Sequence, residues 1–63
     1  MIRIRELRKE KNLSQKDLAT QFHVAQNTIS GWEKGMRDPD TDTVAALAAF
    51  FDVSTDYLLG NTD

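Results

Sequence analysis

Residues 15–32 of the chain read QKDLATQFHVAQNTISGW. Within this stretch, Leu18, Ala19 and Phe22 are spaced as one apolar stripe of a helix with 3.6 residues per turn. Ile29 and Trp32 form a second stripe, and residues 23–25 break the phase between the two. The spacing therefore predicts two short helices that meet at a sharp turn. One continuous helix would keep a single phase throughout.

The second of these helices carries short, uncharged, hydrogen-bonding residues outside its apolar stripe. A side-chain amide can donate to one base atom and accept from its neighbour, which suits the N6/N7 edge of adenine in the major groove. A glycine inside a helix costs about 1 kcal/mol relative to alanine, so Gly31 favours close approach by another surface. The pattern predicts a helix–turn–helix motif over residues 15–34. Its expected base-reading residues are Gln26, Asn27, Thr28, Ser30 and Gly31, although Thr28 and Ser30 could equally contact phosphate.

An ordinary solvated helix surface is the alternative interpretation of Gln26 and Asn27, and an accidental glycine is the alternative for Gly31. Trp32 continues the apolar stripe of Ile29, so we expect it in the core and not stacked on bases.

Length and composition limit the other possibilities. The 63 residues allow one domain, residues 1–63, and contain no cysteine and a single histidine, His23. Neither a disulfide framework, a metal site nor a cofactor site is expected, and no nucleophile–base–acid set points to an enzyme. The longest apolar run is too short to cross a bilayer, and a reducing cytoplasm is the expected compartment.

Charge is divided unequally along the chain. The net charge is −2, yet all eight Lys and Arg lie in residues 1–37 with four acids, a net of +4 there. Residues 38–63 hold six Asp and no Lys or Arg. This asymmetry favours one face for a polyanion and another kept away from it, although scattered surface charge is the alternative.

Helix signals recur along the whole chain. Ser14 is a suitable N-cap with Asp17 three residues on, Gly35 is a suitable C-terminal stop, and Asp40 or Thr41 can cap a further helix. Ser54 can cap a short last helix that Gly60 ends. The expected helices cover about residues 2–11, 15–22, 26–34, 41–51 and 55–59, with no strand pattern.

Further residues are expected to contact phosphate or a second copy of the chain. Backbone amides near Ser14 and Gln15 begin a helix, where the helix dipole favours an anion. The phosphate candidates are Ser14, Gln15, Ala25, Lys34 and Arg37. Phe50, Tyr57 and Leu58 are candidate dimer contacts, unless they complete the core.

These residues resemble the Cro-and-repressor type of helix–turn–helix, the xenobiotic-response-element (XRE) family of bacterial and phage regulators. The similarity extends from Ile4 to Leu59. Its marks are LSQKDLA at 13–19, TISGWEKG at 28–35, Pro39, and DVSTDYLLG at 52–60. The resemblance implies an all-α, compact five-helix bundle of the lambda-repressor-like DNA-binding type that binds its operator as a homodimer.

Residue roles also follow from the resemblance. Gln15 would touch a phosphate, Gln26 and Asn27 would reach base edges, and Gly31 would lie at the groove. An arginine of the first helix often pairs with the glutamate of the W-E motif in this family, which suggests Arg8 with Glu33.

Two positions depart from the family pattern. His23 stands where a glycine usually adopts the left-handed conformation of the turn, at a cost of about 1 kcal/mol. Ala25 stands where a Ser or Thr usually caps the recognition helix, at a cost of roughly 0.5–2 kcal/mol. Both changes bear on stability more than on the reading face.

The expected function is sequence-specific binding of double-stranded DNA by a transcriptional regulator. A prophage-type or plasmid-type repressor on an inverted-repeat operator is the leading interpretation. A protein-interaction module of the same fold, such as a toxin-neutralising antitoxin, is the alternative. The operator, the target genes and the choice between activator and repressor stay open.

Overall fold

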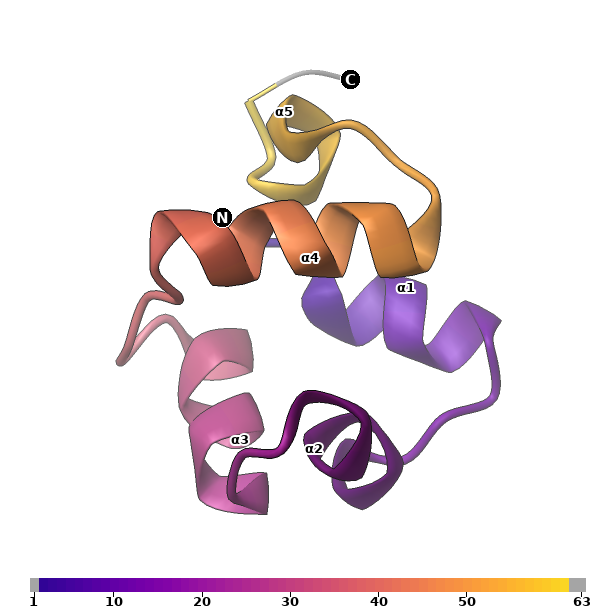
Figure 1. Cartoon of the computed structure of the whole chain (residues 1–63), viewed down its shortest axis with the longest axis vertical. Coiled ribbons are helices and arrows are strands. Elements are labelled where there is room, and N and C mark those ends of the chain that lie inside the picture. Colours follow the sequence, from indigo (N-terminus) through magenta and orange to yellow (C-terminus); the bar gives the residue numbers. More distant parts are fainter. Residues whose placement is uncertain (1, 62–63) are drawn as a thin grey trace.

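A computed structural model describes residues 2–61, and these form five helices and no strand. Figure 1 shows α2 and α3 side by side at one end of the molecule, α4 and α5 at the other, and α1 between them. The all-α five-helix prediction is confirmed. The helices are α1 (Ile4–Glu10), α2 (Gln15–Phe22), α3 (Gln26–Lys34), α4 (Thr41–Phe51) and α5 (Thr55–Leu58).

The first helix is shorter than the sequence suggested. It begins at Ile4, and Ile2 lies before it, packed on the edge of the core. The backbone N–H of Arg3 donates to the carbonyl oxygen of Leu58 at 2.8 Å. The chain therefore enters α1 by pairing with the end of α5, a contact that local sequence could not reveal.

Side-chain caps begin three of the helices, as expected. Ser14 and Asp17 form a reciprocal capping box: the Asp17 N–H donates to Ser14 Oγ at 2.9 Å and the Ser14 N–H donates to Asp17 Oδ2 at 3.0 Å. Asp40, not Thr41, caps α4 by accepting from the Thr43 N–H at 2.8 Å. Ser54 caps α5 in the same way through the Tyr57 N–H.

The turn between α2 and α3 adopts the strained geometry expected from its sequence. His23 has φ 56° and ψ 41°, in the left-handed region that glycine favours. The N–H of Val24 then donates to the carbonyl oxygen of Ala19 at 3.0 Å, which closes the end of α2. Ala25 has extended φ/ψ and supplies no side-chain cap to α3.

A single hydrophobic core joins all five helices. Trp32 lies in it with 6% of its surface exposed, so the prediction of a core tryptophan is confirmed. The buried apolar residues are Ile4, Leu7, Leu18, Ala19, Ile29, Trp32, Leu47, Ala48, Phe51 and Leu58.

The three candidate dimer contacts lie in different environments. Leu58 is fully buried, so its prediction as a dimer contact is wrong: the short helix α5 turns this side chain into the core. Phe50 is half-buried and packs edge-on against Phe22, with ring centroids 5.6 Å apart. Tyr57 is half-buried beneath the Arg3 guanidinium, 4.7 Å from the ring centroid.

Phe50 and Tyr57 each lie under a cation that flanks α1. The Lys11 ammonium lies 5.9 Å from the Phe50 ring, whereas Arg3 covers Tyr57, and these two cations flank opposite ends of α1.

Replacing His23 and Ala25 by the residue types usual for the family is expected to stabilise the protein. His23→Gly should raise the free energy of unfolding by about 1 kcal/mol, because glycine adopts a positive φ without a Cβ clash. Ala25→Ser should add about 1 kcal/mol through a side-chain cap on α3. In a domain of this size each gain corresponds to about 4–8 °C in Tm, measured by circular dichroism.

Lys16→Gly provides the control for this test. Lys16 is an exposed position inside α2, where glycine should lower stability by about 1 kcal/mol. If His23→Gly destabilises the protein as Lys16→Gly does, the left-handed conformation of His23 is not a source of strain.

Candidate nucleic-acid interface

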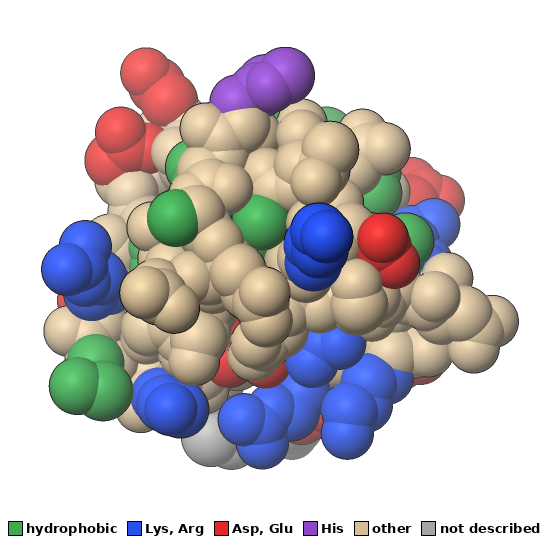
Figure 2. Space-filling model, turned by 90° about the horizontal axis from the view of Figure 1, so that it is seen from below, with side chains coloured by type: hydrophobic (Ala, Val, Ile, Leu, Met, Phe, Trp, Pro, Cys, Tyr) green, Lys and Arg blue, Asp and Glu red, His purple; other side chains and the backbone are tan. Residues whose placement is uncertain are grey.

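One face of the molecule is formed by α2, the turn and the N-terminal end of α3. Figure 2 shows this face, with uncharged polar side chains and backbone over most of its middle, a few apolar side chains among them, and most of the visible Lys and Arg side chains along one edge. Gln26 and Asn27 are exposed here, at the first two positions of α3. Thr28, Ser30 and Gly31 are half-exposed. The inward stripe of Ile29 and Trp32 holds α3 so that these polar positions face outward.

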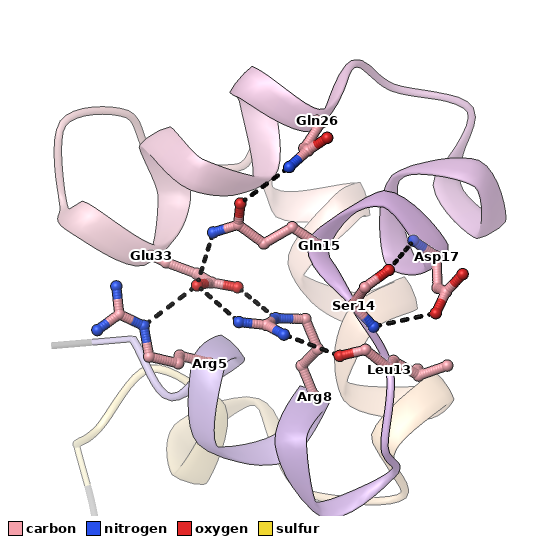
Figure 3. A network of polar contacts seen from close by, with 8 residues as sticks. All are labelled: Arg5, Arg8, Leu13, Ser14, Gln15, Asp17, Gln26 and Glu33. Carbon is pink, nitrogen blue, oxygen red and sulfur yellow. Dashed lines mark hydrogen bonds and ion pairs between the residues drawn. The ribbon is translucent and has the colours of Figure 1, made fainter.

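Gln15 connects the first base-reading candidate to the protein interior. The Gln26 Nε2 donates to Gln15 Oε1 at 3.4 Å, and the Gln15 Nε2 donates to Glu33 Oε1 at 3.1 Å (Figure 3). Because the Glu33 carboxylate can only accept, it fixes which end of the Gln15 amide faces inward. The Gln15 oxygen is thereby presented to Gln26.

The Glu33 carboxylate is the centre of this network. Its side chain has no exposed surface, and Arg8 meets it with two nitrogens, Nε to Oε2 at 2.7 Å and Nη2 to Oε1 at 3.2 Å. Arg5 Nε adds a third arginine contact at 3.3 Å. The remaining Arg8 nitrogen, Nη1, donates to the carbonyl oxygen of Leu13 at 2.8 Å. The predicted Arg8–Glu33 pair is confirmed, and it is part of a larger cluster.

Opposing effects set the pKa of Glu33. Burial raises it, but hydrogen bonds from Arg8, Gln15 and Arg5 outweigh that effect, so the pKa lies below its usual value of 4.5. Glu33 is therefore ionised at neutral pH. The roles of Arg5 and Gln15 at Glu33 were missed from sequence. The spacing of Arg5 and Arg8, one helical turn apart on α1, was the available signal.

The residues expected to contact phosphate differ in their exposure and in their hydrogen bonds within the protein. The Ser14 N–H donates to the Asp17 carboxylate within the protein, and the phosphate contact expected at Ser14 stays a prediction. Ala25 is exposed and leaves the first turn of α3 without a side-chain cap. Lys34 and Arg37 are exposed at the other end of that helix.

A close approach at Gly31 does exist, but within the chain itself. A Cβ placed on Gly31 would lie 3.2 Å from Cδ and 3.3 Å from Cγ of Arg37. Met36, beside Arg37, is 78% exposed, a feature that the sequence analysis did not single out. A hollow next to α3 is lined by Asn27, Ser30, Gly31, Lys34, Met36 and Arg37.

Within residues 2–61, no three His, Cys, Asp or Glu side chains gather where they could hold a metal ion. In the same part of the chain, every helix is too short or too polar to cross a membrane.

Comparison with known proteins agrees with this geometry. The sequence model of the helix–turn–helix family matches residues 4–58. The chain is 41% identical over 61 residues to the HTH-type transcriptional regulator ImmR of Bacillus subtilis (strain 168), covering 97% of this chain and 48% of that protein. It is 43% identical over 58 residues to the HTH-type transcriptional regulator AnsR of the same organism, covering 92% and 50%.

A phage protein is also similar. The cryptic phage CTXphi transcriptional repressor RstR of Vibrio cholerae is 36% identical over 61 residues, covering 97% of this chain and 55% of that protein. The chain thus spans about half the length of these relatives. It belongs to the helix–turn–helix family, which confirms the resemblance found from its motifs.

Removing the Glu33 charge is expected to destabilise the fold. Glu33→Gln leaves the buried Arg8 without a counter-charge, which should lower the free energy of unfolding at pH 7 by about 3 kcal/mol. Because folding lowers the Glu33 pKa, its stabilisation is complete above pH 4.5 and is lost as the pH falls through the folded value. Urea unfolding between pH 7 and pH 3 should therefore show a flatter pH dependence for the variant.

Glu6→Gln is the matched control for this measurement. Glu6 lies 3.9 Å from Arg3 and is 60% exposed, so its loss should cost roughly 0.5 kcal/mol or less. The caps Asp17 and Asp40 also have lowered pKa values and remain in both variants. Equal losses for Glu33→Gln and Glu6→Gln would contradict the central role of Glu33.

Proposed function

We propose that this chain is the operator-binding part of a transcriptional regulator and binds double-stranded DNA by inserting α3 into the major groove. The observation that carries this proposal is the exposed pair Gln26 and Asn27 at the start of a helix whose other face is buried. The names of ImmR, AnsR and RstR, all transcriptional regulators or repressors, support the same function.

Base reading is assigned to the two amides. Gln26 gives one amide hydrogen to Gln15 and keeps a second donor and its oxygen, the pair that adenine N7 and N6 require. Asn27, one position further along α3, reads the adjacent step, with Thr28 and Ser30 at the edge of the contact.

Phosphate contacts would then hold the helix in the groove. Ala25 supplies no side-chain cap to α3, so backbone N–H groups in the first turn of this helix point along its axis toward the solvent. They can bind a phosphate oxygen of one DNA strand. The first turn of α2, near Gln15, and the exposed Lys34 are the other proposed contacts. With few cations involved, the salt dependence should be shallow for a DNA-binding protein.

The proposed regulator acts as a homodimer in the cytoplasm, and its leading mode is repression by occupying an inverted repeat. A twofold dimer would present two copies of α3 about 34 Å apart, one turn of DNA. Phe50 and Tyr57 remain the proposed dimer contacts. Six Asp in residues 38–63 would keep the opposite half of each subunit away from phosphate.

Removing the two amides should abolish sequence preference. The double variant Gln26→Ala/Asn27→Ala is expected to lose its preference for sites selected from random duplexes, while weak salt-sensitive binding persists. Fluorescence anisotropy against a selected site and a scrambled site at two salt concentrations measures both effects.

Asn61→Ala is the control, because it removes an exposed amide shortly after α5, the helix that lies at the end of the molecule opposite α2 (Figure 1). It should leave both affinities unchanged. Retained preference in the Gln26/Asn27 variant would show that other residues read the bases.

Symmetry of the bound site gives an independent check. The selected duplexes should contain two inverted half-sites about 10 base pairs apart, centre to centre. Sedimentation of the free protein at micromolar concentration reports whether two chains associate without DNA. Recovery of a single, asymmetric half-site would contradict the dimer.

A further inference from the structure

Gly31 and Arg37 are packed together on the outer side of α3. The aliphatic stem of Arg37 lies so close to Gly31 that a Cβ there would meet Cδ at 3.2 Å and Cγ at 3.3 Å. Those distances are closer than nine in ten real Cβ contacts, so the glycine leaves the space that the arginine stem occupies. The backbone N–H groups of Met36 and Arg37 both donate to the Gly31 carbonyl oxygen, at 2.9 and 3.2 Å, and hold the loop against the helix.

The place beside Gly31 where the Arg37 stem packs lies on the proposed DNA-reading face. Asn27, Gly31 and Lys34 are spaced four and three residues apart, so they share one face of α3. This face is opposite the buried Ile29 and Trp32. The same hollow is lined by Asn27 and by Arg37, which brings the loop arginine beside a residue proposed to read bases.

The charged end of Arg37 is not used inside the protein. Within the part of the chain that the structure describes, its guanidinium takes part in no hydrogen bond or ion pair, whereas Arg3, Arg5 and Arg8 are all engaged. Arg37 is exposed, so the group remains hydrated. The stem packs beside Gly31 while the five N–H donors are free.

We propose that Arg37 is a specificity-determining residue that reads a guanine in the major groove, in the space left open by Gly31. This inference rests on the proposed function and replaces the expectation that Arg37 only clamps phosphate. A guanidinium binds O6 and N7 of guanine with two parallel hydrogen bonds, the commonest specific contact to a base. A contact to phosphate does not require a packed arginine stem, because any flexible cation at the edge of the interface can make it.

Pre-positioning explains why the glycine is useful. A free arginine loses much rotamer freedom when it binds, and packing its stem on Gly31 removes part of that loss beforehand. Gly31 is thus a positioning residue: its lack of a side chain leaves room for the stem that carries the guanidinium.

The test compares Arg37→Lys with the wild type on a selected operator and on versions carrying each base substitution. Lysine keeps the charge but cannot form the paired contact, so discrimination at one G·C pair in each half-site should fall roughly 5- to 150-fold. The slope of affinity against salt should stay the same. Lys34→Met is the matched control, expected to weaken binding to all sequences alike and to reduce that slope by about one.

Gly31→Ala separately tests the packing of the Arg37 stem on Gly31. Its Cβ should displace the Arg37 stem and reduce discrimination at the same base pair, and the double variant with Arg37→Lys should be no worse than Arg37→Lys alone. Alanine is the better helix former, so Gly31→Ala should not lower Tm. Loss of discrimination together with a lower Tm would leave Arg37→Lys as the deciding variant.

The outcomes separate this inference from the proposed function. An equal loss at every sequence for Arg37→Lys, or no loss at all, overturns the guanine contact. If Gln26→Ala/Asn27→Ala still loses preference in that case, the proposed function stands. If neither variant changes the preference, the assignment of α3 as the reading helix fails as well.

Discussion

The Glu33 carboxylate lies in α3 with its side chain fully buried, and its charge must be balanced by donors from other helices. Arg5 and Arg8 on α1 and Gln15 on α2 supply them, so a single group ties three helices together (Figure 3). An ionised carboxylate without such partners would cost several kcal/mol in the interior. The relative positions of α1, α2 and α3 are therefore restricted by hydrogen-bond geometry as well as by apolar packing.

The same group acts on the surface. Glu33 orients Gln15, and Gln15 offers its oxygen to Gln26, so a buried charge determines how an exposed amide is presented. At the other end of α3, Gly31 has a comparable role for Arg37 through packing in place of hydrogen bonding. Side chains that face solvent are normally free to change rotamer, and both arrangements reduce that freedom. Such restriction favours sequence-specific contact over general attraction to phosphate.

The stability of so small a domain leaves little margin for strained positions. Ten apolar residues form the core within residues 2–61, yet His23 adopts a left-handed conformation and Ala25 leaves its helix uncapped. Capping by Ser14, Asp40 and Ser54 offsets part of this cost, because each satisfies backbone donors that helix ends leave open. Asn12 and Asp52 adopt the same left-handed conformation after α1 and α4, so the strain is shared among three turns and includes the one that sets the angle between α2 and α3.

Local features of the chain were enough to predict most helix ends, the left-handed turn at His23, the core position of Trp32 and the exposed amides of α3. These depend on periodicity, caps and turn residues, which act over a few neighbours. The outward direction of Gln26 and Asn27 follows from the same periodicity, because Ile29 and Trp32 must point inward.

Contacts between distant residues could not be read in this way. Sequence alone determined the helices and the polar character of one helix face, because those properties are local. Only the tertiary structure decided that Leu58 lies in the core, that Glu33 gathers Arg5 and Gln15 beside Arg8, and that Arg37 occupies the space beside Gly31. Each of these depends on how whole helices and loops pack against one another, and packing is set by the shape and charge of the complete core.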